Sequence, residues 1–202
     1  MPMRDQQISW KRKKVFIEPL RGMGWTTAGT VPLGLHTGAP VCAEVSTFGY
    51  SVVRFDAATD EWVQLWQIPY DLDPEHPVYI SVLWSTVAAA ADTVDFTLTY
   101  TRLNTGSEIA AAATALDTTI AQDTHTGTTL TINKTEQGKI DGGTLSDGDF
   151  LVLETTVDAS TVGDGAGDFT SPAEYIYFLG LEITYTPRMC AGIGQSYEAP
   201  TS

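Results

Sequence analysis

Apolar and polar residues alternate along two neighbouring segments of this chain. Residues 93–101 place an apolar side chain at every second position and Thr or Asp between them, and residues 77–84 repeat this period of two. Strict alternation predicts β-strands with one buried and one exposed face. The small and polar stretch 85–92 is expected to turn, so the two runs are predicted to form an antiparallel pair.

The longest alternating run lies near the C-terminus. Its apolar face comprises Tyr175, Tyr177, Leu179, Leu181, Ile183 and Tyr185. A strand of this length usually runs through the middle of a sheet, and we expect residues 149–158 to pair with it. The apolar start of that partner, Phe150 to Leu153, predicts burial on both faces. The Gly-rich segment 159–172 is predicted to be a surface loop.

Shorter β segments are bounded by Gly, Pro, Asp or Asn, which interrupt regular structure. They are residues 14–18, 41–47, 50–56 and 128–134. Residues 61–68 carry tryptophans at helical spacing, but the run is short and is closed by Pro69, so we predict a strand. Residues 107–122 are compatible with either a short helix or an irregular crossing.

About eight strands without alternating long helices predict an all-β fold, either an antiparallel sandwich or a closed barrel. A chain of 202 residues is long enough for one such domain. The sequence has no internal repeat with a period of 20–50 residues, so a repeat protein is disfavoured. The simplest organisation is an N-terminal arm (1–22), one β-sandwich body (23–190) and a flexible C-terminal tail (191–202).

Charge is unevenly distributed along the chain. The formal net charge is −14, which would repel a polyanion, so the body is not expected to bind nucleic acid. Residues 1–22, however, hold six cations and two acids, a net charge of +4, whereas the other residues hold five cations and 23 acids, a net charge of −18. The sequence therefore predicts a basic arm on an acidic body.

The arm supplies the candidate contact residues, because cations with flanking tryptophans suit docking on an acidic partner. These candidates are Arg4, Trp10, Lys11, Arg12, Lys13, Lys14, Arg21 and Trp25. An equally good interpretation is that the lysines flank the first strand and keep its edge soluble. The other three tryptophans, Trp62, Trp66 and Trp84, are expected in the core.

The sequence shows no pattern typical of a catalytic or metal site. His36, His76 and His125 stand alone, and the common nucleophile, phosphate-loop and zinc-helix motifs are absent. Cys42 and Cys190 are too few for a disulfide scaffold, and whether they pair stays open. No apolar run approaches the about 20 residues of a membrane span, and no export signal follows the first Met. We therefore predict no cofactor and no membrane partner.

Two groups of aspartates lie in Gly-rich segments. They are Asp141, Asp147 and Asp149, and Asp158, Asp164 and Asp168. Their spacing does not fit a calcium-binding EF-hand loop, so ordinary acidic turns are favoured over calcium ligands. Asn133-Lys134-Thr135 is a formal glycosylation sequon and is predicted to be incidental.

Three stretches together resemble jelly-roll proteins encoded among the structural genes of tailed bacteriophages. They are Trp66-Gln-Ile-Pro-Tyr-Asp71 with the following Val78–Trp84 run, Leu145-Ser-Asp-Gly-Asp-Phe-Leu-Val-Leu153, and Tyr175–Tyr185. The likeness covers roughly residues 41–187 and its motifs are short. It implies a jelly-roll-like sandwich of about eight strands.

The same resemblance implies a capsid decoration (cement) protein. Such a protein is non-enzymatic, commonly a homotrimer, bound to the major capsid protein on the outer surface of a virion that assembles in the host cytoplasm. The basic arm would then reach across a seam between capsid subunits. An alternative is a receptor- or glycan-binding virion appendage that uses loop 159–172. An enzyme is the least favoured class.

Overall fold

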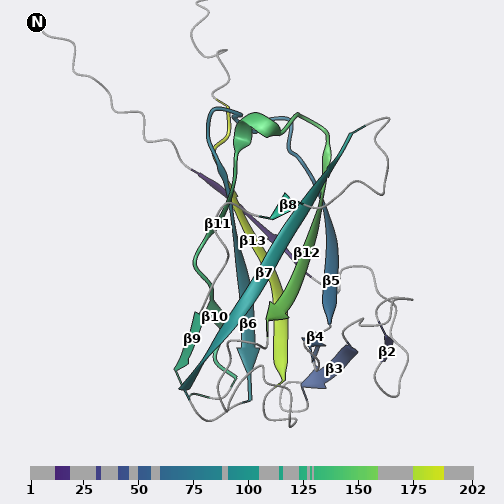
Figure 1. Ribbon diagram of the computed structural model, residues 1–202, viewed down its shortest axis with the longest axis vertical. Helices are drawn as coiled ribbons and strands as arrows, with labels where there is room; N and C mark the ends of the chain where they lie inside the picture. Colours follow the sequence, from purple (N-terminus) through teal and green to yellow (C-terminus); the bar gives the residue numbers. More distant parts are fainter. Residues whose placement is uncertain are drawn as a thin grey trace, which may run out of the picture.

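The computed structural model describes residues 12–18, 31–32, 41–45, 50–55, 60–87, 91–104, 114–115, 123–126, 128, 130–158 and 175–188 (Figure 1). Their strands are β1 (Lys13–Ile17), β2 (Val31–Pro32), β3 (Val41–Val45), β4 (Tyr50–Phe55), β5 (Glu61–Gln67), β6 (Val78–Thr86), β7 (Ala91–Leu103), β8 (Thr114–Ala115), β9 (Asp123–Thr126), β10 (Asn133–Lys134), β11 (Gly138–Ile140), β12 (Phe150–Asp158) and β13 (Ile176–Tyr185). A single 3-10 turn, η1 (Gly142–Thr144), joins β11 to the β12 segment. This part of the chain contains no helix long and apolar enough to cross a bilayer.

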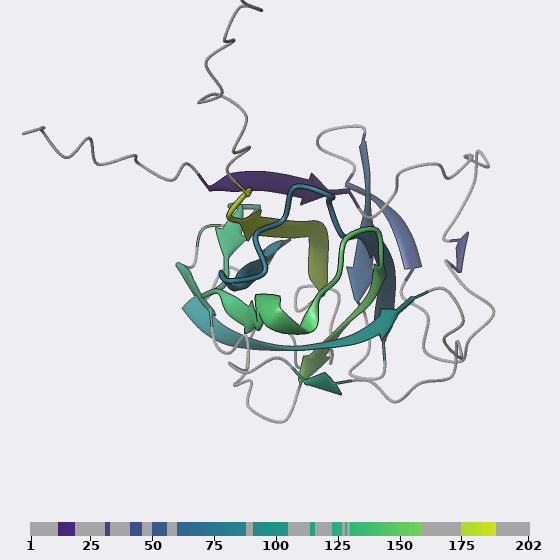
Figure 2. The same ribbon diagram turned by 90° about the horizontal axis from the view of Figure 1, so that it is seen from above.

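The strands form two antiparallel sheets. The first has the order β10-β6-β13-β4-β3-β2, with β1 also paired to β13 and β11 also paired to β6. The second has the order β5-β12-β7-β8, with β9 also paired to β7. Figure 2 shows β7 on one side of the interior, and β13 with β1 on the other. The predicted all-β sandwich is confirmed.

The connectivity is that of a jelly roll. Eight successive strand positions are occupied by β4, β5, β6, β7, β9, the interrupted pair β10 and β11, β12 and β13. Numbered one to eight, they give the order 1-8-3-6 in one sheet and 2-7-4-5 in the other. Because most connections cross from one sheet to the other, two Greek keys fold over each other and enclose one core.

Both predicted strand pairings are wrong. β6 pairs with β13 rather than with β7, and β12 pairs with β5 and β7 rather than with β13. In a jelly roll the next strand along the chain usually enters the opposite sheet, so nearness in sequence does not imply pairing. The central position predicted for β13 is confirmed, since β6 flanks one side of it and β1 and β4 flank the other.

Two local predictions also need correction, and one open alternative is narrowed. Among the described residues of 128–134, only those of β10 form a strand, because Leu130 adopts a left-handed φ of 58° in a turn. Within 107–122, where a short helix and an irregular crossing were both left open, the described residues Thr114 and Ala115 form strand β8, so the helix is not found at these two positions. The start of β12 is not buried on both faces, since Phe150 is 41% exposed on the outer side of its sheet.

The core lies between the inward faces of the two sheets. Trp84 from β6 is fully buried and packs on Phe96 from β7, with ring centroids 5.9 Å apart, so this pair connects the sheets. Trp66 is also buried, and Trp62 packs against the core from its edge. The prediction of core tryptophans is confirmed for Trp84 and Trp66, whereas Trp62 is only partly buried.

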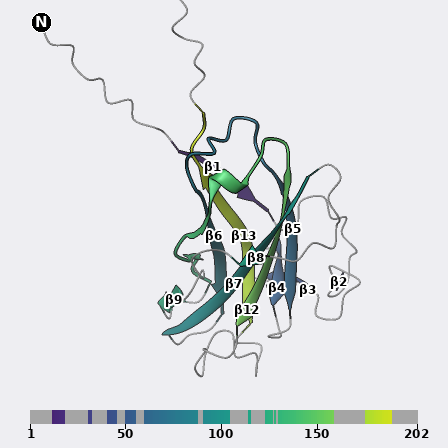
Figure 3. The ribbon, with the colours of Figure 1, turned by 45° about the horizontal axis from the view of Figure 1, so that its top comes forward.

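Strand β1 is held against β13 in five register pairs, from Lys13 opposite Tyr185 to Ile17 opposite Leu181 (Figure 3). The close approach depends on Gly180, where the register of β13 shifts and φ is 137°. A side chain there would collide with the Ile17 carbonyl oxygen and the Phe16 ring. Glycine is therefore required for β1 to lie in this place.

Candidate functional site

The two faces of β1 explain how its charges are presented. Val15 and Ile17 pack against the core, whereas Lys14 and Phe16 are exposed on the outer face of the first sheet. Successive side chains of a strand point to opposite faces, so burial of the two apolar residues directs Lys14 outward. Lys14 is therefore held on the outer face of the sheet by the pairing of β1 with β13.

Sheet register places Lys14 in a cross-strand row with a second lysine. Lys14 of β1 lies opposite Thr184 of β13, Thr184 lies opposite Tyr79 of β6, and Tyr79 lies opposite Lys139 of β11. Three strand spacings separate the ends of this row, a span of about 14 Å. Residues from the two ends and the middle of the chain therefore share one surface.

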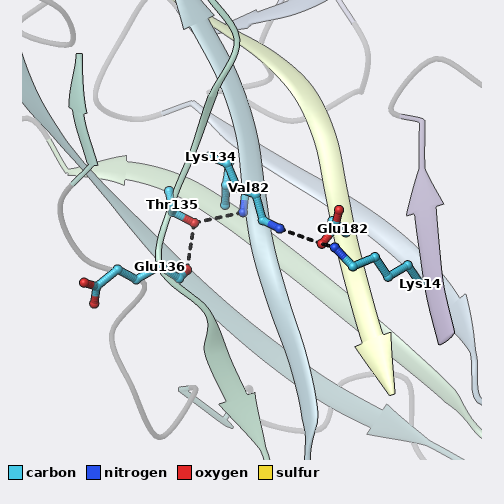
Figure 4. A network of polar contacts seen from close by, with 6 residues as sticks. All are labelled: Lys14, Val82, Lys134, Thr135, Glu136 and Glu182. Atoms are coloured by element: carbon cyan, nitrogen blue, oxygen red, sulfur yellow. Dashed lines mark hydrogen bonds and ion pairs between the residues drawn. The ribbon is translucent and has the colours of Figure 1, made fainter. Parts of the chain in front are cut away.

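Glu182 joins the row to a third lysine (Figure 4). Its Oε1 accepts hydrogen bonds from Lys14 Nζ at 3.0 Å and from Lys134 Nζ at 2.6 Å. Thr135 anchors the β10 segment, since its hydroxyl accepts from the Val82 amide at 3.0 Å. In Figure 4 the Glu136 side chain extends away from this network, which leaves one carboxylate between two ammonium groups.

The two lysines also change the acidity of that carboxylate. The hydrogen bond from Lys134 is the largest cause that lowers the pKa of Glu182, and the bond from Lys14 adds to it against the opposing effect of burial. Charge-assisted hydrogen bonds favour the ionised acid. Glu182 is therefore a carboxylate throughout the neutral range.

We expect Glu182→Gln to lower the free energy of unfolding at pH 7 by up to about 1 kcal/mol for each ion pair lost. A carboxylate whose pKa is lowered in the folded state stabilises the fold above its ordinary pKa, here 4.5, and loses this effect as the pH falls through the lowered value. Urea titrations from pH 7 to pH 3 should show the difference between wild type and variant shrinking below about pH 4.5. Glu136→Gln is the control, and an equal loss in both variants would contradict the expectation.

Arg12 and Lys13 occupy different environments at the start of β1. The Arg12 guanidinium lies over the Tyr79 ring, 4.8 Å from its centroid, and so joins the row of Lys14 and Lys139. Lys13 instead pairs with Asp71, which also accepts a hydrogen bond from the Tyr185 hydroxyl at 3.1 Å. The bond from Lys13 is the largest cause that lowers the pKa of Asp71.

We call the surface formed by Arg12, Lys14, Lys134, Lys139 and Glu182 the basic face. Its four cations and one acid give a net charge of +3 in a chain of −14. The other three cations of the body serve the fold. Arg54 lies over the Tyr175 ring, Arg102 binds Asp149 and the turn before it, and Arg188 pairs with Asp147.

The predicted contact residues divide into two groups. Arg12, Lys13 and Lys14 are described, and the sheet brings Arg12 and Lys14 together while Lys13 turns to Asp71. The others, Arg4, Trp10, Lys11, Arg21 and Trp25, lie outside the described residues. The interpretation that the lysines belong to the first strand holds for Lys13 and Lys14, which are strand residues with partners inside the domain.

Lys134, Lys139 and Glu182 were missed by the sequence analysis. They lie more than a hundred residues from β1 along the chain. The alternation of buried and exposed positions in their short strands could have indicated that the three side chains are exposed. No pattern along the sequence, however, indicates that β11, β6, β13 and β1 lie side by side. The basic face depends on sheet order.

Several acidic residues and one histidine of the described segments belong to turns and ion pairs. Asp141 caps η1 by accepting from the Gly143 amide at 3.0 Å, and His76 Nδ1 lies 3.0 Å from Asp73 Oδ2. Among the described residues, no group of three or more His, Cys, Asp or Glu is arranged to hold a metal ion. His36, Asp164, Asp168, Cys190 and loop 159–172 lie outside them.

The sequon is not presented for glycosylation. Asn133 is 8% exposed, and its amide nitrogen donates to the Thr131 carbonyl at 3.0 Å. A buried, hydrogen-bonded amide is not accessible to a modifying enzyme. This agrees with the prediction that the sequon is incidental.

The outer face of the second sheet carries exposed apolar side chains. Val63 and Leu65 of β5 and Phe150 of β12 are 46%, 62% and 41% exposed. Val63 lies opposite Glu154, whose pKa is raised first by burial and then by the nearby charge of Glu61. The two broad faces of the sandwich therefore differ, one cationic and the other apolar with carboxylates.

Comparison with known proteins leaves the chain without an assigned family. No protein-family model matches the sequence, and no curated protein matches it.

Proposed function

We propose that this chain is a non-enzymatic structural protein of a virion that decorates a capsid and stabilises it by bridging capsid subunits. The supporting observation is the basic strand β1, which is fixed along the central strand of a jelly-roll sheet in an otherwise acidic protein. A decoration protein needs a rigid body and a surface complementary to its support. The jelly roll supplies the rigid body, and β1 supplies charge opposite to that of an acidic support.

The resemblance to jelly-roll proteins of tailed phages gives this proposal its particular form. The fold alone does not specify a function, because jelly rolls also occur in lectins and in metal-dependent enzymes. Charge provides the second argument. A neutral carbohydrate gains little from a cluster of cations, whereas an acidic protein lattice gains both attraction and orientation.

The proposal predicts a homotrimer that binds capsids. Light scattering coupled to size exclusion should give three times the chain mass of 21.8 kDa. Sedimentation with capsids of the encoding virus should bring the full chain down at a fixed stoichiometry, and decorated capsids should resist heating better than bare ones. Decorated capsids should resist heating because a protein that binds only the assembled capsid stabilises the assembled state.

A truncation separates the two parts of the N-terminal region. Removing residues 1–11 leaves β1 and its pairing with β13 intact. If the arm bridges subunits, the truncated protein should remain folded while its capsid binding weakens. A full chain that is strictly monomeric and does not sediment with capsids would contradict the proposed function.

A further inference from the structure

We propose that the basic face is a preformed docking surface for an acidic protein, in which Lys14 and Lys134 together bind a carboxylate of the partner. The inference rests on the proposed function and specifies its contact. It extends the contact beyond the N-terminal segment, because half of the cations come from β10 and β11.

Glu182 keeps two ammonium groups close together in advance. Lys14 Nζ and Lys134 Nζ donate to the same Oε1 at 3.0 and 2.6 Å, so the two nitrogens lie no more than 5.6 Å apart. An ammonium group has three donors, so each lysine retains donors for a second acceptor. A partner carboxylate can therefore bridge both lysines without displacing Glu182, and little side-chain entropy is lost on binding.

Arg12 and Lys139 extend the same surface. The Tyr79 ring supports the Arg12 guanidinium from one side, which leaves the edge of its planar fork for an acceptor. Neither Arg12 nor Lys139 forms an ion pair with any residue that the structure describes, and both are exposed. Four cations over about 14 Å can thus meet several carboxylates of one protein surface.

The polar layer under these cations retains unused hydrogen-bonding groups. Ser81 lies opposite Glu182, and Thr184 lies opposite Lys14. Both are buried, and their hydroxyl groups have no hydrogen-bond partner within the described part of the chain. The layer beneath Lys14 and Glu182 is therefore polar but does not occupy the donors of the two lysines, which stay bound to Glu182.

Charge distribution favours a protein over a nucleic acid. Outside the basic face the chain carries −17, because the face itself contributes +3 to the total of −14. An extended polyanion would reach beyond the small basic face and be repelled by the acidic body. An acidic protein patch of the same size as the basic face would avoid this repulsion. Attraction is confined to this face, so it also orients the complex.

The test measures the binding of fluorescein-labelled hexaglutamate by fluorescence anisotropy at low ionic strength. The patch variant is Lys134→Gln with Lys139→Gln. The control variant, Lys13→Gln with Arg188→Gln, removes the same charge from cations that pair with Asp71 and Asp147. We expect about a tenfold loss of affinity in the patch variant and less than about a twofold loss in the control, since each exposed ion pair contributes modestly.

Three results would overturn the inference. Equal losses in the two variants would mean that the peptide responds only to net charge. Tighter, lysine-dependent binding of a six-nucleotide DNA strand would indicate a nucleic-acid surface instead. Unchanged sedimentation of the patch variant with capsids would place the capsid contact elsewhere.

The last result would leave the proposed function intact. If the wild-type chain does not bind capsids at all, the proposed function fails separately, and the hexaglutamate comparison still decides whether the basic face binds acidic protein.

Discussion

Replacing Trp84 with alanine should lower the free energy of unfolding by about 3–5 kcal/mol. Its indole is the largest fully buried side chain among the residues that the structure describes, and its contact with Phe96 connects the two sheets. Truncation removes buried apolar area and leaves a cavity that a close-packed sandwich cannot fill. Urea denaturation followed by circular dichroism and tryptophan fluorescence would measure the loss.

Leu65→Ala is the matched control for Trp84→Ala. Leu65 belongs to a strand of the same sandwich but is 62% exposed, so its truncation should change stability by less than about 0.5 kcal/mol. Comparable losses in the two variants would contradict the assignment of Trp84 to the core. A folded Trp84→Ala protein with wild-type stability would contradict it as well.

Gly180→Ala should destabilise the protein by about 2–4 kcal/mol, as overpacking and an unfavourable left-handed backbone combine. The added methyl group would collide with the Ile17 carbonyl oxygen at a φ of 137°. The change that removes this collision with the least loss of other contacts is the separation of β1 from β13. Trypsin should then cleave after Lys13 or Lys14 much faster than in the wild type, because a paired strand resists proteolysis.

Gly143→Ala provides the comparison, since a methyl group there meets its nearest neighbour at 3.5 Å, an ordinary contact. Its stability and its trypsin cleavage should stay close to wild type. Release of β1 in Gly180→Ala should also weaken hexaglutamate binding, because Lys14 leaves Glu182. Wild-type protection of β1 in this variant would show that the strand does not depend on the glycine.

The sequence predicted most of the longer strands because their burial is local information, but it assigned the wrong face to the first half of β13. Ile176 and Phe178 are buried there rather than Tyr177 and Leu179, because the register shifts before Gly180 and changes which side chains face inward. Val94, Phe96 and Leu98 alternate with polar residues, and they face the core as the period of two requires. Strand pairing was predicted wrongly because it depends on loops that cross between sheets. The same alternation in β6 and β7 is satisfied whether the strands are neighbours or face each other across the core.

The candidate site was predictable only in its N-terminal part. The cluster at Lys11 to Lys14 is visible as a run of like charges, but alternation sends Lys13 and Lys14 to different environments. Lys134 and Lys139 look like isolated surface lysines in the sequence. Their partnership with Lys14 follows from the placement of β13 between β1 and β6, which depends on the whole topology.

The pairing of β1 with β13 has a consequence for how the protein is made. During synthesis β1 must wait for β13, since Lys14 and Glu182 are 168 residues apart. Contacts of such long sequence separation form slowly, after much of the chain has been ordered. The basic face therefore exists only once synthesis has passed β13 and β13 has paired with β1, so copies that end before β13 would not compete for the partner.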